Sequence, residues 1–310
     1  MSILLLSFPL WLWACSSAKN TNANKSNEAD TSSAEPPEAY SVGVGGEVEL
    51  DFLLIDVSAG DPLGRYTLTR NVYLMTTEIT QAMFSSLRGY SACEVNGCDM
   101  GEGDTLPAYH MTWYEAAALA NDLSISENLE ECYSCSGTGA EITCQESSTY
   151  PDQDIYLCPG YRLPTDAEWE YVARATVSSD MWTATGGGSI SGASENSCQS
   201  GVTLSDGTVI ADLAWYCANA GSQPQDIAQR QANGFGVYDM HGNVFEWCQD
   251  WYDVWWQIGV NPVNTSGTTK LMRGGAWDTE PYELRANYRE HNWADSRHDN
   301  VGFRVVRTGP

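Results

Sequence analysis

The chain has 310 residues, of which 42% are hydrophobic, enough apolar material for the core of one large domain. Its 15 Lys and Arg against 41 Asp and Glu give a formal net charge of −26, which argues against nucleic acid as a partner because nucleic-acid binders neutralise phosphates with basic surfaces. Such an acidic surface suits an exported protein or a cation-binding one, although a solvated face is its commonest meaning.

The N-terminus has the pattern of an export signal. Residues 1–14, MSILLLSFPLWLWA, are apolar, uncharged and too short to span a bilayer, which is typical of a signal peptide. They end before Cys15, which resembles the acylated cysteine of a bacterial lipoprotein. Residues 15–44 form a polar tether with too few apolar residues to fold. We expect a lipid-anchored protein of the cell envelope, and Ser16 favours the outer membrane; a plain secretory signal is the alternative.

Nine further cysteines bear on the compartment. Cys132 and Cys135 have the C-x-x-C spacing of a zinc ribbon, but no second such pair follows, so disulfides are the favoured interpretation for an exported chain. Spacing does not fix the connectivity. The pairs that we expect are Cys93–Cys98, Cys132–Cys158, Cys135–Cys144 and Cys198–Cys217. Cys248 is then left over, and its aromatic neighbours predict a buried thiol.

The predicted elements begin with two strands, over residues 46–58 and 66–80, which have the alternation and the β-branched and aromatic content of strands. A helix is predicted from Thr80 onward, because apolar residues follow it at helical spacing. The clearest amphipathic helices lie over residues 111–129 and 161–175, and each contains an S/T-x-x-E capping box.

The second half of the chain has fewer periodic segments. Residues 177–233 are rich in Gly, Ser, Asn and Asp and lack the Gly-Lys-Ser/Thr of a phosphate-binding loop, so they predict irregular loops. Residues 300–307, NVGFRVVR, predict the last core strand. The whole reads as one α+β domain over residues 45–310, with two helices, short mixed sheets and much irregular backbone.

Four motifs then stand in order along the chain. They are LPAYHMTWYEAAALAN, YRLPTDAEWEYVARA, GFGVYDMHGNVFEWCQDWY and the closing stretch that runs from LMRGGAW to NVGFRVVR. Together they resemble the formylglycine-generating-enzyme, or sulfatase-modifying-factor, family over most of the chain beyond residue 47. The resemblance implies a fold similar to the C-type lectins, with bound calcium.

The resemblance also implies a copper site, held by two thiolates in the strip after the Arg273-Gly274-Gly275 turn. In this chain Thr279 and Leu284 stand where the two cysteines belong, and Ala276 stands where a Ser is expected. Soft Cu(I) requires thiolate ligands. We therefore expect no copper and no formylglycine-generating oxidase activity.

A structural calcium site is implied within YDMHGNVFEW. The family ligands map onto the side chains of Asp239 and Glu246 and the main-chain carbonyls of Gly242 and Val244. These are the hard oxygen ligands that Ca²⁺ prefers. The alternative is that the two acids only satisfy main-chain amides of an aromatic loop. A second family calcium site, near residues 196–212, is left unassigned.

Residues 271–307, which we call the closing segment, also predict a ligand-binding face, because Trp, Tyr and Arg anchor interfaces. Its candidates are Trp277, Asp278, Tyr282, Arg285 and Trp293, and the ligand class is a protein, a peptide or a carbohydrate. Arg285, with Arg289, equally suits structural ion pairs between loops. We favour a non-catalytic binding or assembly module. The alternative is an enzyme of divergent chemistry, with Asp278, Glu280 or His291 as acid or base.

Overall fold

The structure is a computed structural model that describes residues 38–190, 195–255 and 258–310. All of these described residues belong to one compact unit. The expected signal peptide, Cys15 and most of the expected tether lie outside the described residues. Within the described ranges, no helix is both long enough and apolar enough to cross a membrane.

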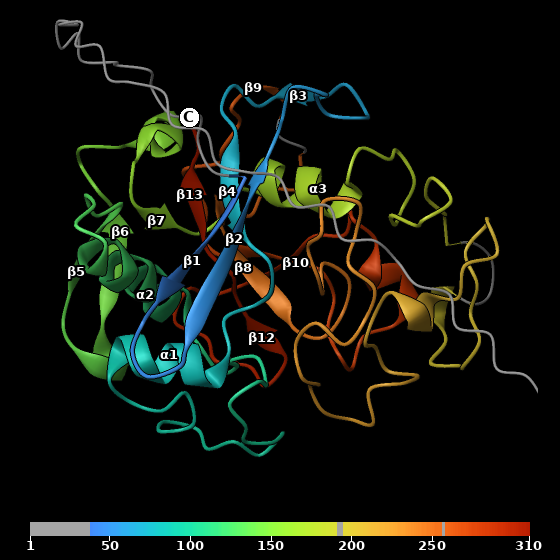
Figure 1. The fold of residues 1–310 in the computed structure, drawn as a ribbon, viewed down its shortest axis with the longest axis horizontal. Coiled ribbons are helices and arrows are strands. Elements are labelled where there is room, and N and C mark those ends of the chain that lie inside the picture. Colours follow the sequence, from blue (N-terminus) through green and yellow to red (C-terminus); the bar gives the residue numbers. More distant parts are fainter. Residues whose placement is uncertain (1–37, 191–194, 256–257) are drawn as a thin grey trace, which may run out of the picture. The chain divides into compact units, whose positions relative to one another are not determined.

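One antiparallel sheet of five strands unites the two ends of the described chain (Figure 1). In spatial order the strands are β1 (Ala39–Gly43), β2 (Glu49–Ile55), β4 (Val72–Met75), β13 (Val306–Thr308) and β7 (Tyr161–Arg162). Folded structure therefore begins before residue 45, the boundary expected from composition. The reason is that β1 is an edge strand with a single buried side chain, Val42, so its sequence carries little apolar signal.

A second sheet has four strands. In spatial order they are β11 (Glu290–Asn292), β10 (Lys270–Arg273), β8 (Phe245–Trp251) and β12 (Val301–Gly302). β12 runs parallel to β8, and the other neighbours are antiparallel. The single strand expected over residues 300–307 is thus two strands, β12 here and β13 in the first sheet. The segment between them crosses the core and carries the fully buried Arg304.

Two strand pairs complete the β structure. β3 (Tyr66–Thr67) pairs in parallel with β9 (Gly259–Val260), and β5 (Tyr133–Ser136) forms a hairpin with β6 (Thr143–Glu146). Short 3-10 helices span Gly139–Glu141, Asp152–Leu157, Ile210–Asp212 and Pro281–Leu284. The α+β fold expected from the sequence is confirmed.

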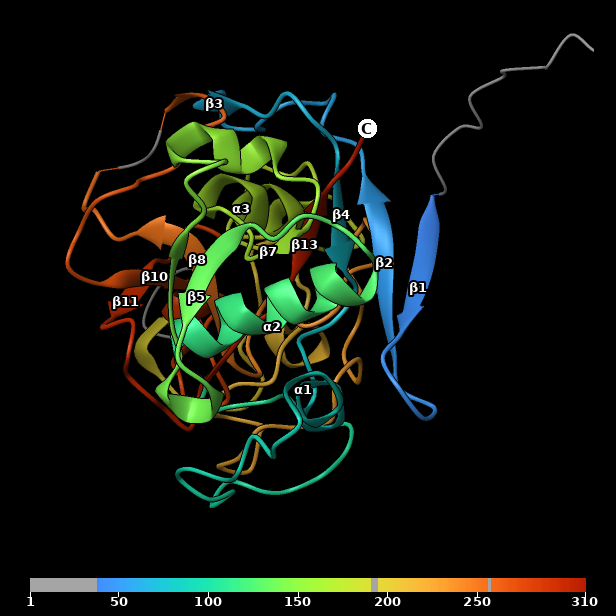
Figure 2. The same ribbon diagram turned by 90° about the vertical axis from the view of Figure 1, so that its left-hand side faces the viewer.

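Three α-helices are present in the described residues: the two amphipathic helices of the expected architecture and a third, which is the helix predicted from Thr80 onward. They are α1 (Gln81–Arg88), α2 (Trp113–Ser126) and α3 (Asp166–Arg174). The predicted capping boxes start the two longer ones: Thr112 Oγ1 accepts from Glu115 N (3.1 Å), and Thr165 Oγ1 accepts from Glu168 N (3.2 Å). α2 packs on β7 and on the β5–β6 hairpin (Figure 2).

Three buried tryptophans tie the helices to β8 through their indole N–H groups. Trp113 donates to Cys248 O, Trp247 donates to Met111 O, and Trp169 donates to a Glu246 carboxylate oxygen, each at 2.8 Å. All three side chains are at most 2% exposed. A buried indole needs such a partner, so these bonds fix how α2 and α3 sit on the second sheet.

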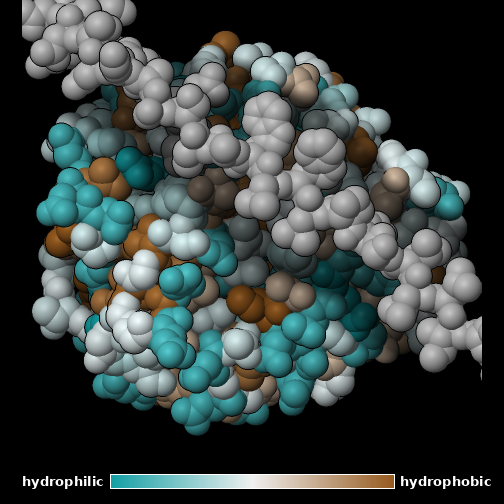
Figure 3. Space-filling view, viewed as in Figure 1, coloured by the Kyte–Doolittle hydropathy of each residue, from teal (hydrophilic) through white to brown (hydrophobic). Residues whose placement is uncertain are grey.

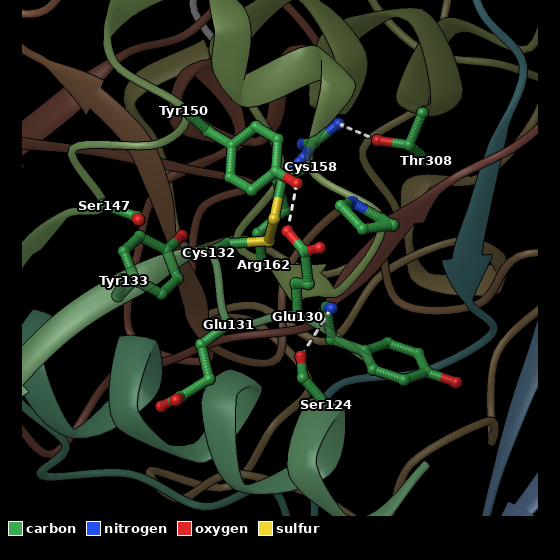
Figure 4. Close-up of a disulfide and its surroundings, with 12 residues drawn as sticks. Ser124, Glu130, Glu131, Cys132, Tyr133, Ser147, Tyr150, Cys158, Arg162 and Thr308 are labelled. Atoms are coloured by element: carbon green, nitrogen blue, oxygen red, sulfur yellow. Dashed lines mark hydrogen bonds between the residues drawn. A yellow bond between two sulfur atoms is a disulfide. The ribbon is translucent and has the colours of Figure 1, made fainter. Parts of the chain in front are cut away.

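Four disulfides link the described cysteines, which confirms the expectation of disulfide bonds. The pairs are Cys93–Cys98, Cys132–Cys158, Cys135–Cys144 and Cys198–Cys217. Figure 4 shows Cys132–Cys158 joining the residue before β5 to the segment before β7, with the Tyr150 hydroxyl donating to the Glu130 carboxylate nearby. Cys248 is free and buried, and burial raises the pKa of its thiol well above the usual range.

Candidate functional site

The strip after β10 begins with two glycines in the left-handed region, Gly274 (φ +102°) and Gly275 (φ +75°). A Cβ on Gly275 would lie 2.8 Å from Leu284 Cδ2 and 3.1 Å from Thr279 Oγ1. Only glycine therefore fits where the turn passes over these two side chains. The tight turn places residues 279 and 284 together in the interior, although neither carries a thiol.

Thr279 and Leu284 have packing roles in this turn. The Thr279 hydroxyl accepts from Ala276 N and donates to Ala276 O, both at 3.0 Å. Leu284 is fully buried, and its main-chain carbonyl accepts from Nδ1 of His241 at 2.7 Å. Burial lowers the pKa of His241 to about 4, so the ring is neutral near pH 7. Neither residue 279 nor residue 284 offers a soft ligand for copper.

The residues predicted for a single binding face are distributed over several places. Tyr282 and Arg285 line a hollow of about 300 Å³, together with Tyr252, Tyr288 and Arg289. We call it the tyrosine hollow.

Asp278 lines a second hollow of about 330 Å³, together with Glu283, Glu290, His291 and His298. We call it the acidic hollow. Tyr288 lines the tyrosine hollow, and its hydroxyl proton is shared between Glu283 (3.2 Å) and Glu290 (2.9 Å) of the acidic hollow, so the two hollows are neighbours. Three acids of the closing segment, Asp278, Glu283 and Glu290, thus line one hollow, and the rings of Tyr282 and Tyr288 line the other.

The two predicted tryptophans line neither hollow. Trp277 is only 8% exposed; its indole N–H donates to Asp299 O at 3.3 Å, and its ring packs with Val244 and Ala220. Trp293 is 59% exposed. On the face drawn in Figure 3, hydrophobic and hydrophilic residues are interspersed among those that the structure describes. The described surface in this view therefore carries its apolar residues in small groups.

The arginines of the closing segment make the ion pairs that their sequence also suggests. Arg285 pairs with Glu195 at 2.9 Å and with Asp180 at 3.4 Å, and Arg289 pairs with Asp166 at 3.0 Å. Arg285 therefore contributes both to the wall of the tyrosine hollow and to the joining of loops. Burial raises the pKa of Glu283 in the acidic hollow, which favours the protonated form of this carboxyl relative to an exposed one.

The predicted calcium ligands lie in the turn before β8 and, for Glu246, at the start of β8 itself. Asp239 is 3% exposed; its Oδ2 accepts from Ala228 N at 2.7 Å, and its Oδ1 has no hydrogen-bond partner among the described residues. Burial raises the pKa of Asp239 to about 6. Both oxygens of Glu246 are already engaged, by Arg304 at 2.6 and 2.7 Å and by the Trp169 indole at 2.8 Å. Glu246 is thus neutralised within the protein, whereas Asp239 is not.

Glu78 is the functional candidate that the sequence did not reveal. It is fully buried, and neither carboxylate oxygen has a hydrogen-bond partner among the described residues. Burial, and next the charge of Asp239, raise the pKa of Glu78 well above its usual range. The only sequence signal was an acid in the predicted strand over residues 66–80.

A hard cation fits the unpartnered oxygens of Glu78 and Asp239. No group of three or more His, Cys, Asp or Glu side chains in the described ranges is arranged to hold a metal ion. A cation here therefore needs main-chain oxygens as well, as in the ligand set expected from Gly242 and Val244. Without a cation, the raised pKa values favour the protonated, uncharged forms of the two acids.

Comparison with known proteins gives a consistent assignment. Residues 25–309 match the family described as the sulfatase-modifying factor enzyme 1-like domain. A protein named chaperone protein LppX, from Paenibacillus barcinonensis, is 28% identical over 259 residues, which cover 76% of this chain and 80% of that protein. The formylglycine-generating enzyme of Mus musculus is 30% identical over 155 residues, covering 47% of this chain and 39% of the enzyme.

Among solved structures, Treponema denticola variable protein 1 is similar with a TM-score of 0.65 and 25% identity. The alignment covers 88% of this chain and 99% of that one. The similarity therefore extends over most of the chain.

Proposed function

This chain belongs to the sulfatase-modifying factor family, and from that premise we propose that it is an exported, lipid-anchored binding or assembly module without formylglycine-generating oxidase activity. The observation that supports the lack of oxidase activity is the state of the cysteines. Eight of the nine described cysteines form disulfides, and the ninth, Cys248, is buried with a raised pKa. The described residues therefore provide no pair of free thiolates that could bind copper. Positions 279 and 284, where the family has its two cysteines, carry Thr and Leu.

Polypeptide binding is the function that the site supports best. The tyrosine hollow offers three aromatic rings beside two arginines, the composition of an interface anchor. The similarity to a protein named as a chaperone, over four fifths of that protein, supports a polypeptide ligand. The acidic hollow next to it adds carboxylates for basic or amide groups of the same ligand.

The test is an aggregation assay with a chemically unfolded client protein, followed by light scattering. We expect the purified protein to suppress aggregation, and Tyr282→Ala to weaken the suppression at unchanged melting temperature. Asp56→Asn, an exposed acid remote in sequence from the hollows, is the matched control. In parallel, a sulfatase-type Cys peptide with copper and oxygen should keep its sulfur. Loss of that sulfur by mass spectrometry would refute the non-oxidase proposal.

An enzyme of divergent chemistry is the second candidate. Asp278 and His291 line the acidic hollow together with Glu283, whose pKa is raised, so an acid and a base are available at one place. Glu280 is not among the residues that line it. An enzymatic activity of the wild type that is lost in the Glu283→Gln variant and retained in the Glu280→Gln variant would favour this candidate.

Export and lipid attachment rest on the N-terminal pattern and on the four disulfides, which favour an oxidising compartment. We expect radioactive fatty acid to label the protein in cells, and Cys15→Ala to abolish the label and release the protein from membranes. Label that persists in the Cys15 variant would contradict the lipoprotein assignment. Separation of inner and outer membranes then tests the outer-membrane expectation.

Calcium is the cofactor that we propose for the buried acids. Asp239 and the carbonyls of Gly242 and Val244 would hold it, with Glu246 fixed beside them by Arg304 and with Glu78 as an additional carboxylate. A bound Ca²⁺ would supply the positive charge that the unpartnered oxygens of Glu78 and Asp239 lack. The role is structural, since these side chains are all at most 3% exposed.

A further inference from the structure

A hollow of about 820 Å³, more than twice the volume of the tyrosine or acidic hollow, opens beside the start of α2. Its walls come from the N-terminus of α2, the β5–β6 hairpin, the end of β8 and the start of β10. The lining residues used below are Tyr114, Ser134, Gln145, Glu146, Trp251 and Lys270. We call it the hairpin cleft, and it shares no lining residue with either hollow of the closing segment.

The floor of the hairpin cleft is a lysine between two indole rings. Lys270 is 2% exposed, and its ammonium nitrogen lies 4.0 Å from the Trp113 ring centroid and 4.3 Å from that of Trp251. The same nitrogen donates to Gln249 O at 2.7 Å. Two cation–π contacts and a hydrogen bond hold the group in place, so the floor is rigid before any ligand arrives.

The rim is polar and uncharged. Ser134, Ser136, Thr143, Gln145 and Ser148 are exposed and supply hydroxyl and amide groups, each able both to donate and to accept. The hairpin that carries the first four is closed by the Cys135–Cys144 disulfide. Tyr114 and Trp251, both partly exposed, add aromatic surface at the same opening.

The composition of the cleft excludes several ligand classes. Lys270 is the only Lys or Arg among the described residues of the lining, and Glu146 lies there too, so the described part of the cleft lacks the cationic cluster that a polyanion requires. Burial lowers the pKa of Lys270 to about 7, which leaves the amine only partly charged at neutral pH and further favours an uncharged ligand. An apolar ligand would leave the hydroxyl-rich rim without partners.

We propose that the hairpin cleft binds a neutral oligosaccharide, with sugar C–H faces against Trp251 and Tyr114 and sugar hydroxyls bonded to the Ser, Thr and Gln side chains of the rim. A pyranose ring has apolar faces and a hydroxyl edge, and this cleft offers both complements. The inference stands on the cleft alone and does not depend on the function proposed for the closing segment.

The experiment titrates the full chain, purified with detergent, with cellotetraose, maltotetraose and chitotetraose, and follows binding by calorimetry and by tryptophan fluorescence. We expect saturable binding of at least one of them with a Kd between about 10 µM and about 1 mM. Trp251→Ala should weaken it at least about tenfold, the loss of roughly one aromatic contact. Gln145→Ala, at an exposed rim position, should weaken it about threefold at unchanged melting temperature.

Tyr282→Ala, in the tyrosine hollow, is the matched control and should leave sugar binding unchanged. Failure of all three neutral sugars to bind at about 10 mM would overturn the proposal, since this lies well above the expected range of Kd. Binding that is equal in the wild type and in both cleft variants would also overturn it. So would a tetragalacturonate that binds more tightly than every neutral sugar, because it would make the ligand an anion.

Discussion

Arg304 and Glu246 form a two-point ion pair in the core, with Nη2 to Oε1 at 2.6 Å and Nε to Oε2 at 2.7 Å. Both side chains are 0% exposed. Arg304 also donates to the carbonyls of Met75 and Tyr238, so a single guanidinium joins the first sheet, the turn before β8, and β8 itself. Removing one partner of such a pair leaves the other charge buried and uncompensated.

We therefore predict that Arg304→Met lowers the free energy of unfolding by about 3–5 kcal/mol. Urea unfolding followed by circular dichroism measures it. Arg285→Met is the control, because the side chains of Arg285 and its partner Glu195 are 24% and 30% exposed, and it should cost less, about 1 kcal/mol. Equal losses in the two variants would show that burial of the Arg304 pair does not govern its contribution.

The second prediction concerns acid sensitivity at His241. Burial lowers the pKa of this ring to about 4, against about 6.5 in an unfolded chain. Between these values the unfolded chain binds a proton that the native protein does not, so the free energy of unfolding falls as pH falls through this window. The contribution is on the order of 3 kcal/mol and is fully present above pH about 6.5.

His241→Asn removes this titration and keeps a donor for the Leu284 carbonyl. The difference in unfolding free energy between wild type and variant should shrink as pH is lowered from about 6.5 to about 4. The wild type must be compared with the variant at each pH, because two other groups titrate in the same window. Burial raises the pKa of Asp239 to about 6 and of Asp250 to about 7, so these acids make the protein more stable as pH falls, opposite to His241. A difference that is constant across the window would contradict a buried neutral His241.

Local signals in the sequence predicted local structure well. The capping boxes at Thr112 and Thr165 each involve residues three apart, so the pattern alone places the starts of α2 and α3. The Gly274-Gly275 turn was likewise visible, because a Gly-Gly pair marks a tight turn.

Contacts distant in sequence were not predictable in the same way. The raised pKa of Glu78 depends in part on the charges of Asp239 and Arg304, which are more than 150 residues away in the sequence. No sequence pattern near Glu78 predicts these neighbours. The burial of Trp277 depends on Val244 and Ala220 in the same manner. The hairpin cleft combines α2, β6, β8 and β10, which periodicity describes one at a time.

The third prediction is that chelator lowers the melting temperature of the wild type. A cation bound only to the folded protein stabilises it by about 2.7 kcal/mol at a concentration 100 times its Kd. Glu78→Gln should reduce this response, since the variant lacks one of the two unpartnered carboxylates. Because the pKa of Glu78 is raised in the absence of a cation, protons compete for the site, so the wild-type response should also weaken as pH falls.

Differential scanning fluorimetry with added calcium or EGTA measures the response. Asp278→Asn is the control, because this acid lies at the exposed edge of the acidic hollow and should keep the full effect of chelator. A wild type that melts identically in calcium and in EGTA would remove the basis for a structural calcium ion.

The last prediction separates strain from crowding at two glycines. Gly275 (φ +75°) and Gly259 (φ +102°) both have a backbone that side chains disfavour, but a Cβ on Gly259 meets nothing within 4 Å. Gly259→Ala should therefore lower the free energy of unfolding only through the backbone strain of a positive φ, by about 1 kcal/mol. Gly275→Ala adds a 2.8 Å approach to Leu284 Cδ2 and should cost about 1–3 kcal/mol more. Urea unfolding of both variants measures the difference. Equal costs would mean that the turn can move away from Leu284, and thus that residues 279 and 284 are not fixed in the interior by this turn.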